Sequence, residues 1–280
     1  MNLMDGKQVA ADILCSLTNR VEHLKQLGIT PTLGILLVGN DPRSKTYVHA
    51  KQRAAEKLGI AVRLDERAFA NATEVFDQIQ AWNQDSDVHG IIIQLPLPAD
   101  LASNELHFVE AVLPTKDVDG LHPTNLGRLL RGAPQVIPAT PRGVMALLAQ
   151  YAVSVDGANV TLIGFGKLVG RALATLLLQS GATLTVATSH TRDLAAVTKQ
   201  ADIVISAAGK ANLVTADMIK PDAVLVDVGL SELDERIVGD VSPEARNQAR
   251  LATPVPGGVG PMTVAMLLTN VVEAAERSQR

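Results

Sequence analysis

Apolar residues recur along the first part of the chain with two alternating spacings. Segments whose apolar positions lie three or four residues apart predict helices over Asp5–Leu27, Ser44–Leu58, Thr73–Trp82 and Asn104–Val112. Short, nearly continuous apolar segments between them predict buried strands at Leu33–Val38, Ala61–Leu64 and Val88–Gln94. Thr73, just before Glu74, is the predicted cap of the third helix. Strands and helices in this order are typical of an α/β fold with a mostly parallel sheet.

The pattern changes between residues 113 and 140 and then restarts. This segment holds four prolines and three glycines with little periodicity, which predicts a long irregular connection to a second domain. Beyond it the predicted helices are Pro141–Tyr151, Arg171–Gln179, Leu194–Gln200 and the final Thr263–Arg280. The predicted strands are Val160–Ile163, Leu184–Ala187, Ile203–Ser206 and Val224–Asp227. Repeated βα units of this kind are typical of a dinucleotide-binding domain.

The composition and charge of the chain argue against several classes of function. The chain of 280 residues has a formal charge of −4 and no basic cluster, which argues against nucleic acid as a partner. No apolar segment approaches the roughly 18 residues that span a bilayer, so no membrane segment is expected. The single cysteine, Cys15, and the lack of signal-peptide features predict a cytoplasmic protein. Cys15 falls in an amphipathic segment and is predicted to be a small core residue.

The segment from Ser44 to Lys51 begins a predicted helix shortly after an apolar strand. Tyr47 and Lys51 are four residues apart, so a helix places both on one side. Ser44 lies near the start of the same helix. A phenol, an amine and a hydroxyl at the carboxyl end of a strand can form a proton-transfer site. The alternative is a solvated lysine beside a half-buried tyrosine.

Two further segments place polar groups next to apolar ones. Gln94 ends a predicted strand, where its amide either meets a ligand or satisfies the backbone of the following loop. Asp117 and Asp119 lie two residues apart before Gly120. A carboxylate that binds an amino-heterocycle is favoured over a metal site, because no His–Cys cluster accompanies the pair. The alternative is an Asx-type turn that leads to Gly120.

Two glycine-rich segments indicate ligand binding through the backbone. Gly164, Gly166 and Gly170 lie between a strand and a helix, where N–H groups can approach a diphosphate. No carboxylate ends the next strand, so Ser189, with His190 and Arg192, either faces a 2′-phosphate or caps the following helix. The segment 253–263 holds three prolines and three glycines. This composition predicts a shaped loop near a ligand, neither a helix nor a central strand.

Together these motifs resemble the bifunctional methylenetetrahydrofolate dehydrogenase/methenyltetrahydrofolate cyclohydrolase family. The segments that carry the resemblance are Ser44–Lys51, Gln94–Pro98, Lys116–Gly120, Pro138–Gly143, Asp227–Gly229, Gly239–Val241 and Thr253–Thr263. The resemblance implies a folate-binding catalytic domain, residues 1–140 plus 263–280, and a Rossmann-like dinucleotide-binding domain, residues 141–262, with the active cleft between them. It also implies NADP-dependent oxidation of 5,10-methylenetetrahydrofolate and hydrolysis of the methenyl product to 10-formyltetrahydrofolate. The family is typically a homodimer joined through the cofactor domains.

The same resemblance assigns roles to individual residues. Lys51 matches the family's essential lysine, Tyr47 the tyrosine near the folate, and Gln94 the glutamine that holds the lysine. Asp119 would bind the pterin. The residues implied to line the folate pocket are Pro256 and Gly257. Those implied to contact the cofactor or its surroundings are Thr140, Gly164, Phe165, Gly166, Ser189, Leu230 and Thr263.

One departure from the family pattern lies in the cofactor loop. Phe165 and Gly166 stand where many relatives carry Arg-Ser, and the missing arginine is a partner for a 2′-phosphate. Arg171 or Arg192 would then have to replace it. The alternative reading is therefore an enzyme that prefers NAD, or one that retains a single activity.

Overall fold

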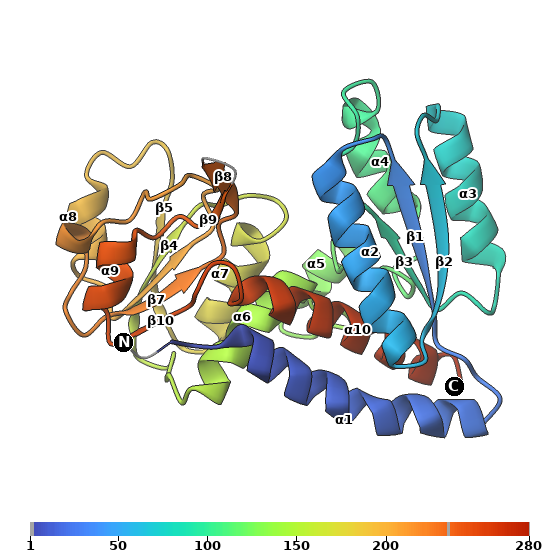
Figure 1. Cartoon of the computed structure of the whole chain (residues 1–280), viewed down its shortest axis with the longest axis horizontal. Helices are drawn as coiled ribbons and strands as arrows, with labels where there is room; N and C mark the ends of the chain where they lie inside the picture. The colour runs from blue at the N-terminus through green and yellow to red at the C-terminus, as the bar shows by residue number, and fades with distance from the viewer. Residues whose placement is uncertain (1–2, 234–235, 280) are drawn as a thin grey trace. The chain divides into compact units, whose positions relative to one another are not determined.

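The computed structural model describes residues 3–233 and 236–279 as two compact α/β units (Figure 1). The three-stranded unit comprises Asp12–Ala139 and Val264–Arg280, and the five-stranded unit comprises Met1–Ala11 and Thr140–Thr263. Met1, Asn2 and Arg280, at the ends of the predicted domain ranges, lie outside the described residues. The predicted fold class, two α/β domains with parallel sheets, is confirmed.

The three-stranded unit is built on a parallel sheet in the order β2-β1-β3. Its strands are β1 (Thr32–Val38), β2 (Ala61–Arg67) and β3 (Gly90–Ile93). Every residue of β1 and β3 is buried, which explains their continuous apolar sequences. Val38 pairs with Arg67 and Leu36 with Ile93, so all three strands end at one edge of the sheet.

Helices cover both faces of this sheet (Figure 1). They are α2 (Pro42–Lys57), α3 (Ala72–Gln84), α4 (Glu105–Ala111) and α5 (Pro123–Leu130). The helix α3 packs so closely that a Cβ atom at Gly34 would lie 2.9 Å from the ring of Trp82. The long helices α1 (Gly6–Gln26) and α10 (Val259–Arg277) each contribute residues to both units. Within the three-stranded unit, Arg20 and Glu276 join them by an ion pair.

The five-stranded unit has a parallel sheet in the order β10-β7-β6-β4-β5. The strands are β4 (Asn159–Ile163), β5 (Thr183–Ala187), β6 (Ile203–Ser206), β7 (Val224–Asp227) and β10 (Leu251–Ala252). A small antiparallel hairpin is formed by β8 (Ser231–Leu233) and β9 (Arg236–Val238). The helices of the unit are α6 (Ala139–Gln150), α7 (Gly170–Gln179), α8 (Leu194–Thr198) and α9 (Pro243–Gln248).

Three local predictions are wrong at prolines or caps. The cap of α3 is Asn71, which forms a reciprocal capping box with Glu74, and Thr73 lies inside the helix. The segment predicted as irregular contains α5, whose first residue is Pro123. The helix α10 begins at Val259, inside the segment predicted to hold no helix. Pro261 is tolerated there because the first turn of a helix has no backbone acceptors for its N–H groups.

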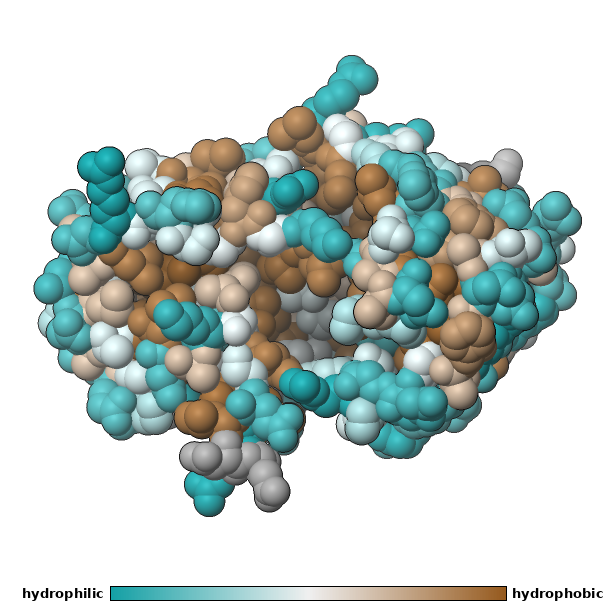
Figure 2. Space-filling view, turned by 90° about the horizontal axis from the view of Figure 1, so that it is seen from above, coloured by the Kyte–Doolittle hydropathy of each residue, from teal (hydrophilic) through white to brown (hydrophobic). Residues whose placement is uncertain are grey.

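The surface corrects one further prediction. Cys15 is exposed and is not a core residue, because it lies on the outer side of α1. Hydrophobic residues are visible among hydrophilic ones on the face drawn in Figure 2. Among the described residues, the most exposed large apolar side chains belong to Phe69 and Leu130. Within residues 3–233 and 236–279, none of the helices has the length and apolar character that crossing a bilayer requires.

Candidate functional site

Lys51 and Gln94 form a hydrogen-bonded pair in the three-stranded unit. The Lys51 Nζ atom on α2 donates to Gln94 Oε1 over 3.0 Å. Gln94 follows β3 directly, and its Nε2 atom donates to the carbonyl oxygen of Leu95 over 2.6 Å. The amide therefore satisfies the backbone of the following loop, which is one of the two roles that the sequence left open, and it also holds Lys51. The alternative of a solvated surface lysine is wrong, because this amine is held against the end of a buried strand.

Burial and opposite charge act against each other at this pair. Both Lys51 and Asp119 keep some accessible surface, yet each is surrounded by protein on most sides. Burial lowers the pKa of Lys51, and the nearby Asp119 carboxylate partly opposes this effect. Burial also raises the pKa of Asp119, and the Lys51 charge partly opposes it. The amine is thus brought nearer to neutrality than a solvated lysine.

Asp117 organises the loop that carries Asp119. Its carboxylate accepts hydrogen bonds from the backbone N–H groups of Gly120, Leu121 and His122, over 2.9 to 3.2 Å. A fourth bond comes from Asn125 Nδ2 over 2.8 Å. The Asx-type turn that the sequence offered as an alternative is therefore formed by Asp117, while Asp119 is the carboxylate beside Lys51. No group of three metal-ligating side chains is present in the described part of the chain.

Ser44 does not belong to a proton-transfer group with Tyr47 and Lys51. Its backbone N–H and its Oγ atom both donate to the Asp41 carboxylate, each over 2.8 Å. Asp41 is the N-cap of α2, which the sequence analysis missed. Tyr47 lies one turn before Lys51 and is 39% exposed. Burial of its ring raises the pKa of its phenol, so the group is neutral at physiological pH.

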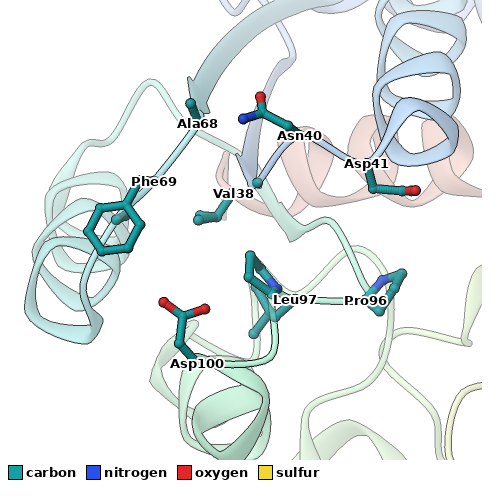
Figure 3. A pocket seen from close by; sticks show the side chains of 11 residues that line it. Val38, Asn40, Asp41, Ala68, Phe69, Pro96, Leu97 and Asp100 are labelled. Atoms are coloured by element: carbon teal, nitrogen blue, oxygen red, sulfur yellow. The ribbon is translucent and has the colours of Figure 1, made fainter.

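A pocket of about 440 Å³ opens at the carboxyl edge of the same sheet (Figure 3). The loops after β1, β2 and β3 all contribute to it, with labelled side chains that include Asn40, Phe69 and Asp100. The carboxyl ends of parallel strands are the usual position of a ligand in an open α/β sheet. Lys51 and Gln94 are not among the pocket's lining residues, so the pocket lies beside the pair and does not contain it.

The turn after β4 in the five-stranded unit is shaped by its glycines. Gly164 has a φ of +100°, and a Cβ atom there would lie 2.5 Å from the Ala207 carbonyl oxygen. A Cβ atom at Gly170 would overlap the Gly164 carbonyl oxygen, whereas Gly166 faces open space. The turn leads into α7, so backbone N–H groups are available at a helix N-terminus. These residues fit the diphosphate of a dinucleotide.

The side chains around this turn differ in their exposure and in the contacts they make. Phe165 is 47% exposed, and the Arg171 guanidinium lies 6.0 Å from the centre of its ring. Ser189 lies exposed after β5. Asp193 caps α8 by accepting from the Ala196 N–H group, so the predicted cap role of Ser189, His190 or Arg192 is wrong.

The remaining cofactor and folate candidates also lie in the five-stranded unit. The hydroxyl oxygens of Thr140 and Thr263 are 3.0 Å apart, although 123 residues separate them in the sequence. Leu230 is 43% exposed and follows β7. Gly257 has a φ of +112°, and its carbonyl oxygen accepts from the Lys7 N–H group. Pro256, which precedes it, is exposed.

Two family models match the chain, and both describe the same family. Residues 4–119 match the catalytic domain of tetrahydrofolate dehydrogenase/cyclohydrolase, and residues 138–279 match its NAD(P)-binding domain. A relative from Aromatoleum aromaticum, named bifunctional protein FolD, is 47% identical over 285 residues. That alignment covers 99% of this chain and 98% of the relative.

Solved structures agree with this comparison. The crystal structure of FolD methylenetetrahydrofolate dehydrogenase/cyclohydrolase from Campylobacter jejuni is 42% identical, with a TM-score of 0.96. The superposition covers 99% of this chain and 99% of the Campylobacter jejuni chain. The Trypanosoma brucei FolD structure, in complex with NADP and an inhibitor, is 36% identical with a TM-score of 0.94. The superposition covers 99% of this chain and 97% of the Trypanosoma brucei chain.

Proposed function

This chain belongs to the tetrahydrofolate dehydrogenase/cyclohydrolase family, and from this premise we infer that it carries out both reactions of that family. It oxidises 5,10-methylenetetrahydrofolate with NADP and hydrolyses the methenyl product to 10-formyltetrahydrofolate. The observation that carries the residue assignment is the bond between Lys51 Nζ and Gln94 Oε1. We propose Lys51, Tyr47, Gln94 and Asp119 as the catalytic and folate-binding residues, with Pro256 and Gly257 as further folate contacts.

The oxidation step demands positioning more than acid–base chemistry. The folate methylene carbon loses a hydride, and the lone pairs of its two nitrogen neighbours stabilise the resulting cation. NADP supplies the hydride acceptor when it is bound. We assign its binding to the turn from Gly164 to Gly166 and to Thr140, Ser189, Leu230 and Thr263. The exposed N–H groups before α7 and the paired threonine hydroxyls support this assignment.

The 2′-phosphate of NADP needs a partner other than the arginine that Phe165 replaces. Arg171 lies over the Phe165 ring, next to the turn that would hold the diphosphate. Ser189 and Arg192 are exposed after β5, and no carboxylate directly ends that strand. We propose that Ser189 and Arg192 contact the 2′-phosphate. The alternative of an NAD-preferring enzyme is not favoured.

The hydrolysis step needs a group that can exchange a proton near neutral pH. Burial brings Lys51 closer to that condition by disfavouring its ammonium form. Gln94 holds the amine without adding a charge that would restore the ammonium form. We propose that Lys51 steers or deprotonates the attacking water and returns a proton to the departing nitrogen. Asp119, beside it, is proposed to hold the pterin by accepting or donating hydrogen bonds.

Replacing the lysine tests this assignment. Lys51→Met should abolish cyclohydrolase activity and leave part of the dehydrogenase activity, because only hydrolysis needs the amine. Both rates should be measured on the same preparation, with folate affinity determined separately. Lys57→Met, an exposed lysine near the end of the same helix, is the matched control and should change neither rate. Equal loss of both activities together with loss of folate binding would make Lys51 a binding residue only.

We further propose that the chain forms a homodimer through the five-stranded unit and acts in the cytoplasm. The edge strand β5 supports the first proposal, because Val186 is 38% exposed on it and Leu178 of the preceding helix α7 is 57% exposed. Apolar side chains exposed along a sheet edge are typical of contact surfaces. The single cysteine supports the second proposal.

A further inference from the structure

Two buried carboxylates hold the loops at the carboxyl edge of the five-stranded sheet. Asp227 ends β7 and is 2% exposed, and Asp240 follows β9 and is fully buried. Neither is assigned a role in the reactions above. We infer that Asp240, held in place by Asp227, is a positioning residue for the dinucleotide site. This inference rests on the proposed function of the unit.

Asp227 fixes the backbone on both sides of the β8–β9 hairpin. Its Oδ1 atom accepts from the N–H groups of Gly229 and Asp240, over 3.0 and 2.9 Å. Its Oδ2 atom accepts from the Val241 N–H group over 2.9 Å. The carboxylate thereby ties the residue before Leu230 to the residue that carries the second carboxylate. A buried, fully bonded carboxylate of this kind is costly to disturb.

Asp240 in turn fixes the loop that follows β6. Its Oδ2 atom accepts from Ser206 Oγ, Ala208 N and Gly209 N, over 2.7 to 3.2 Å. Its Oδ1 atom accepts from Lys210 N over 2.7 Å. Four donors on five consecutive residues thus converge on one side chain. Charge-assisted bonds to backbone N–H groups are among the stronger hydrogen bonds in proteins.

The glycines of the two motifs make room for this arrangement. A Cβ atom at Gly229 would overlap the Asp240 carboxylate, and one at Gly239 would overlap the Asp227 carboxylate. Each glycine therefore allows the carboxylate of the other motif to approach the backbone. The reciprocal contacts explain why Asp-Val-Gly and Gly-Asp-Val stand at residues 227–229 and 239–241.

The loop held by Asp240 borders the glycine turn. Ile163, Ser206 and Asp227 are aligned across β4, β6 and β7, so the loops after them start at one edge. The Ala207 carbonyl oxygen is the atom that a Cβ at Gly164 would strike. A shift of the loop after β6 would therefore move the Ala207 carbonyl group, which packs against the turn that would hold the diphosphate. Asp240 acts on the dinucleotide through these contacts and does not touch the reacting atoms.

The test compares the two activities in Asp240→Asn. An amide has one acceptor oxygen in place of two, so at least one of the four donors loses its partner. We expect the KM for NADP to rise about 10-fold, which corresponds to a loss of roughly 1.4 kcal/mol in binding free energy. The change in kcat should be smaller. Cyclohydrolase activity, which involves the three-stranded unit's Lys51, should stay within about 2-fold of the wild type. Ser206→Ala removes only one of the four donors to Asp240 and should raise the KM for NADP about 3-fold. This milder variant provides the test if Asp240→Asn does not fold.

The matched control is Asp202→Asn. This carboxylate also accepts a backbone N–H, from Asn159, and pairs with Lys220, but it lies at the amino edge of the same sheet. It should leave the KM for NADP unchanged. A folded Asp240→Asn or Ser206→Ala enzyme with the wild-type KM would overturn the inference alone. A wild-type protein that neither oxidises methylenetetrahydrofolate nor binds NADP in a fluorescence titration would overturn the proposed function as well.

Discussion

The hydrogen-bond partner of Lys51 decides how readily its amine loses a proton. A neutral amide at Gln94 accepts one N–H of the amine and adds no field that favours the charged form. The only carboxylate that acts on Lys51 within the described contacts is Asp119, whose own pKa is raised by burial. The site therefore leaves the pKa of Lys51 below its ordinary value, with an amide on one side and a carboxyl group of raised pKa on the other.

Gln94→Glu tests this reading at the scale of one side chain. A carboxylate at hydrogen-bond distance should raise the pKa of Lys51, so the amine would be charged at neutral pH. Cyclohydrolase activity at pH 7.5 should fall by about 10-fold or more and recover as the pH rises. The measurement is kcat for hydrolysis between pH 6 and 10. Gln80→Glu, on the exposed side of α3, is the control. A pH profile identical to that of the wild type would show that the charge of Lys51 does not limit the reaction.

At the scale of the elements, the caps decide where the helices begin. The Asn71 side chain accepts from the Glu74 N–H group over 3.0 Å, and the Glu74 carboxylate accepts from the Asn71 N–H group over 2.8 Å. Asn71→Ala should therefore lower the free energy of unfolding by about 1 kcal/mol. Thr73→Ala, at the position that the sequence had suggested as the cap, should change it by less than about 0.5 kcal/mol. Urea unfolding of both variants measures the difference, and equal effects would contradict the assignment of the cap.

The strands could be predicted more closely than the helix starts. Ile203–Ser206 and Val224–Asp227 coincide with β6 and β7, because strands buried on both faces have continuous apolar sequences. The segments that contain Pro123 and Pro261 were predicted to be irregular, although a proline in the first turn of a helix lacks only an N–H that would have no partner. The distinction depends on the cap before the proline, such as the His122 side chain that accepts from the Thr124 N–H group.

The candidate site could be predicted only in part for a similar reason. Lys51 and Gln94 stood out because a helix spacing and a strand end define their positions from local sequence alone. Asp117 was noticed with its role left open and Asp240 was given no role, since most of their partners are backbone N–H groups whose approach depends on loop conformation. A carboxylate with four donors and a solvated carboxylate have the same sequence signature. Glycines next to the aspartates, at Gly120 and Gly239, were the one available signal.

Across the whole molecule, Asp227 links stability to pH. Burial raises its pKa to about 6 from an ordinary 3.8, and the neighbouring Asp240 carboxylate adds to the effect. Between these two values the folded chain binds more protons than the unfolded chain, so the free energy of unfolding falls as the pH rises. The contribution of Asp227 is fully present below pH 3.8 and is lost as the pH passes 6. Its size is about 3 kcal/mol.

Asp227→Asn isolates this contribution, because an amide does not titrate. The variant loses an acceptor at every pH, so its absolute stability changes. The comparison therefore uses only how steeply the free energy of unfolding changes with pH in each protein. From pH 4 to pH 7 the wild type should lose about 2 kcal/mol of unfolding free energy relative to the variant, as urea titrations would measure. A carboxyl ¹³C titration of Asp227 should show its midpoint near pH 6 over the same range. Parallel stability profiles would mean that Asp227 ionises alike in the folded and unfolded chains, and that its three N–H donors fully offset its burial.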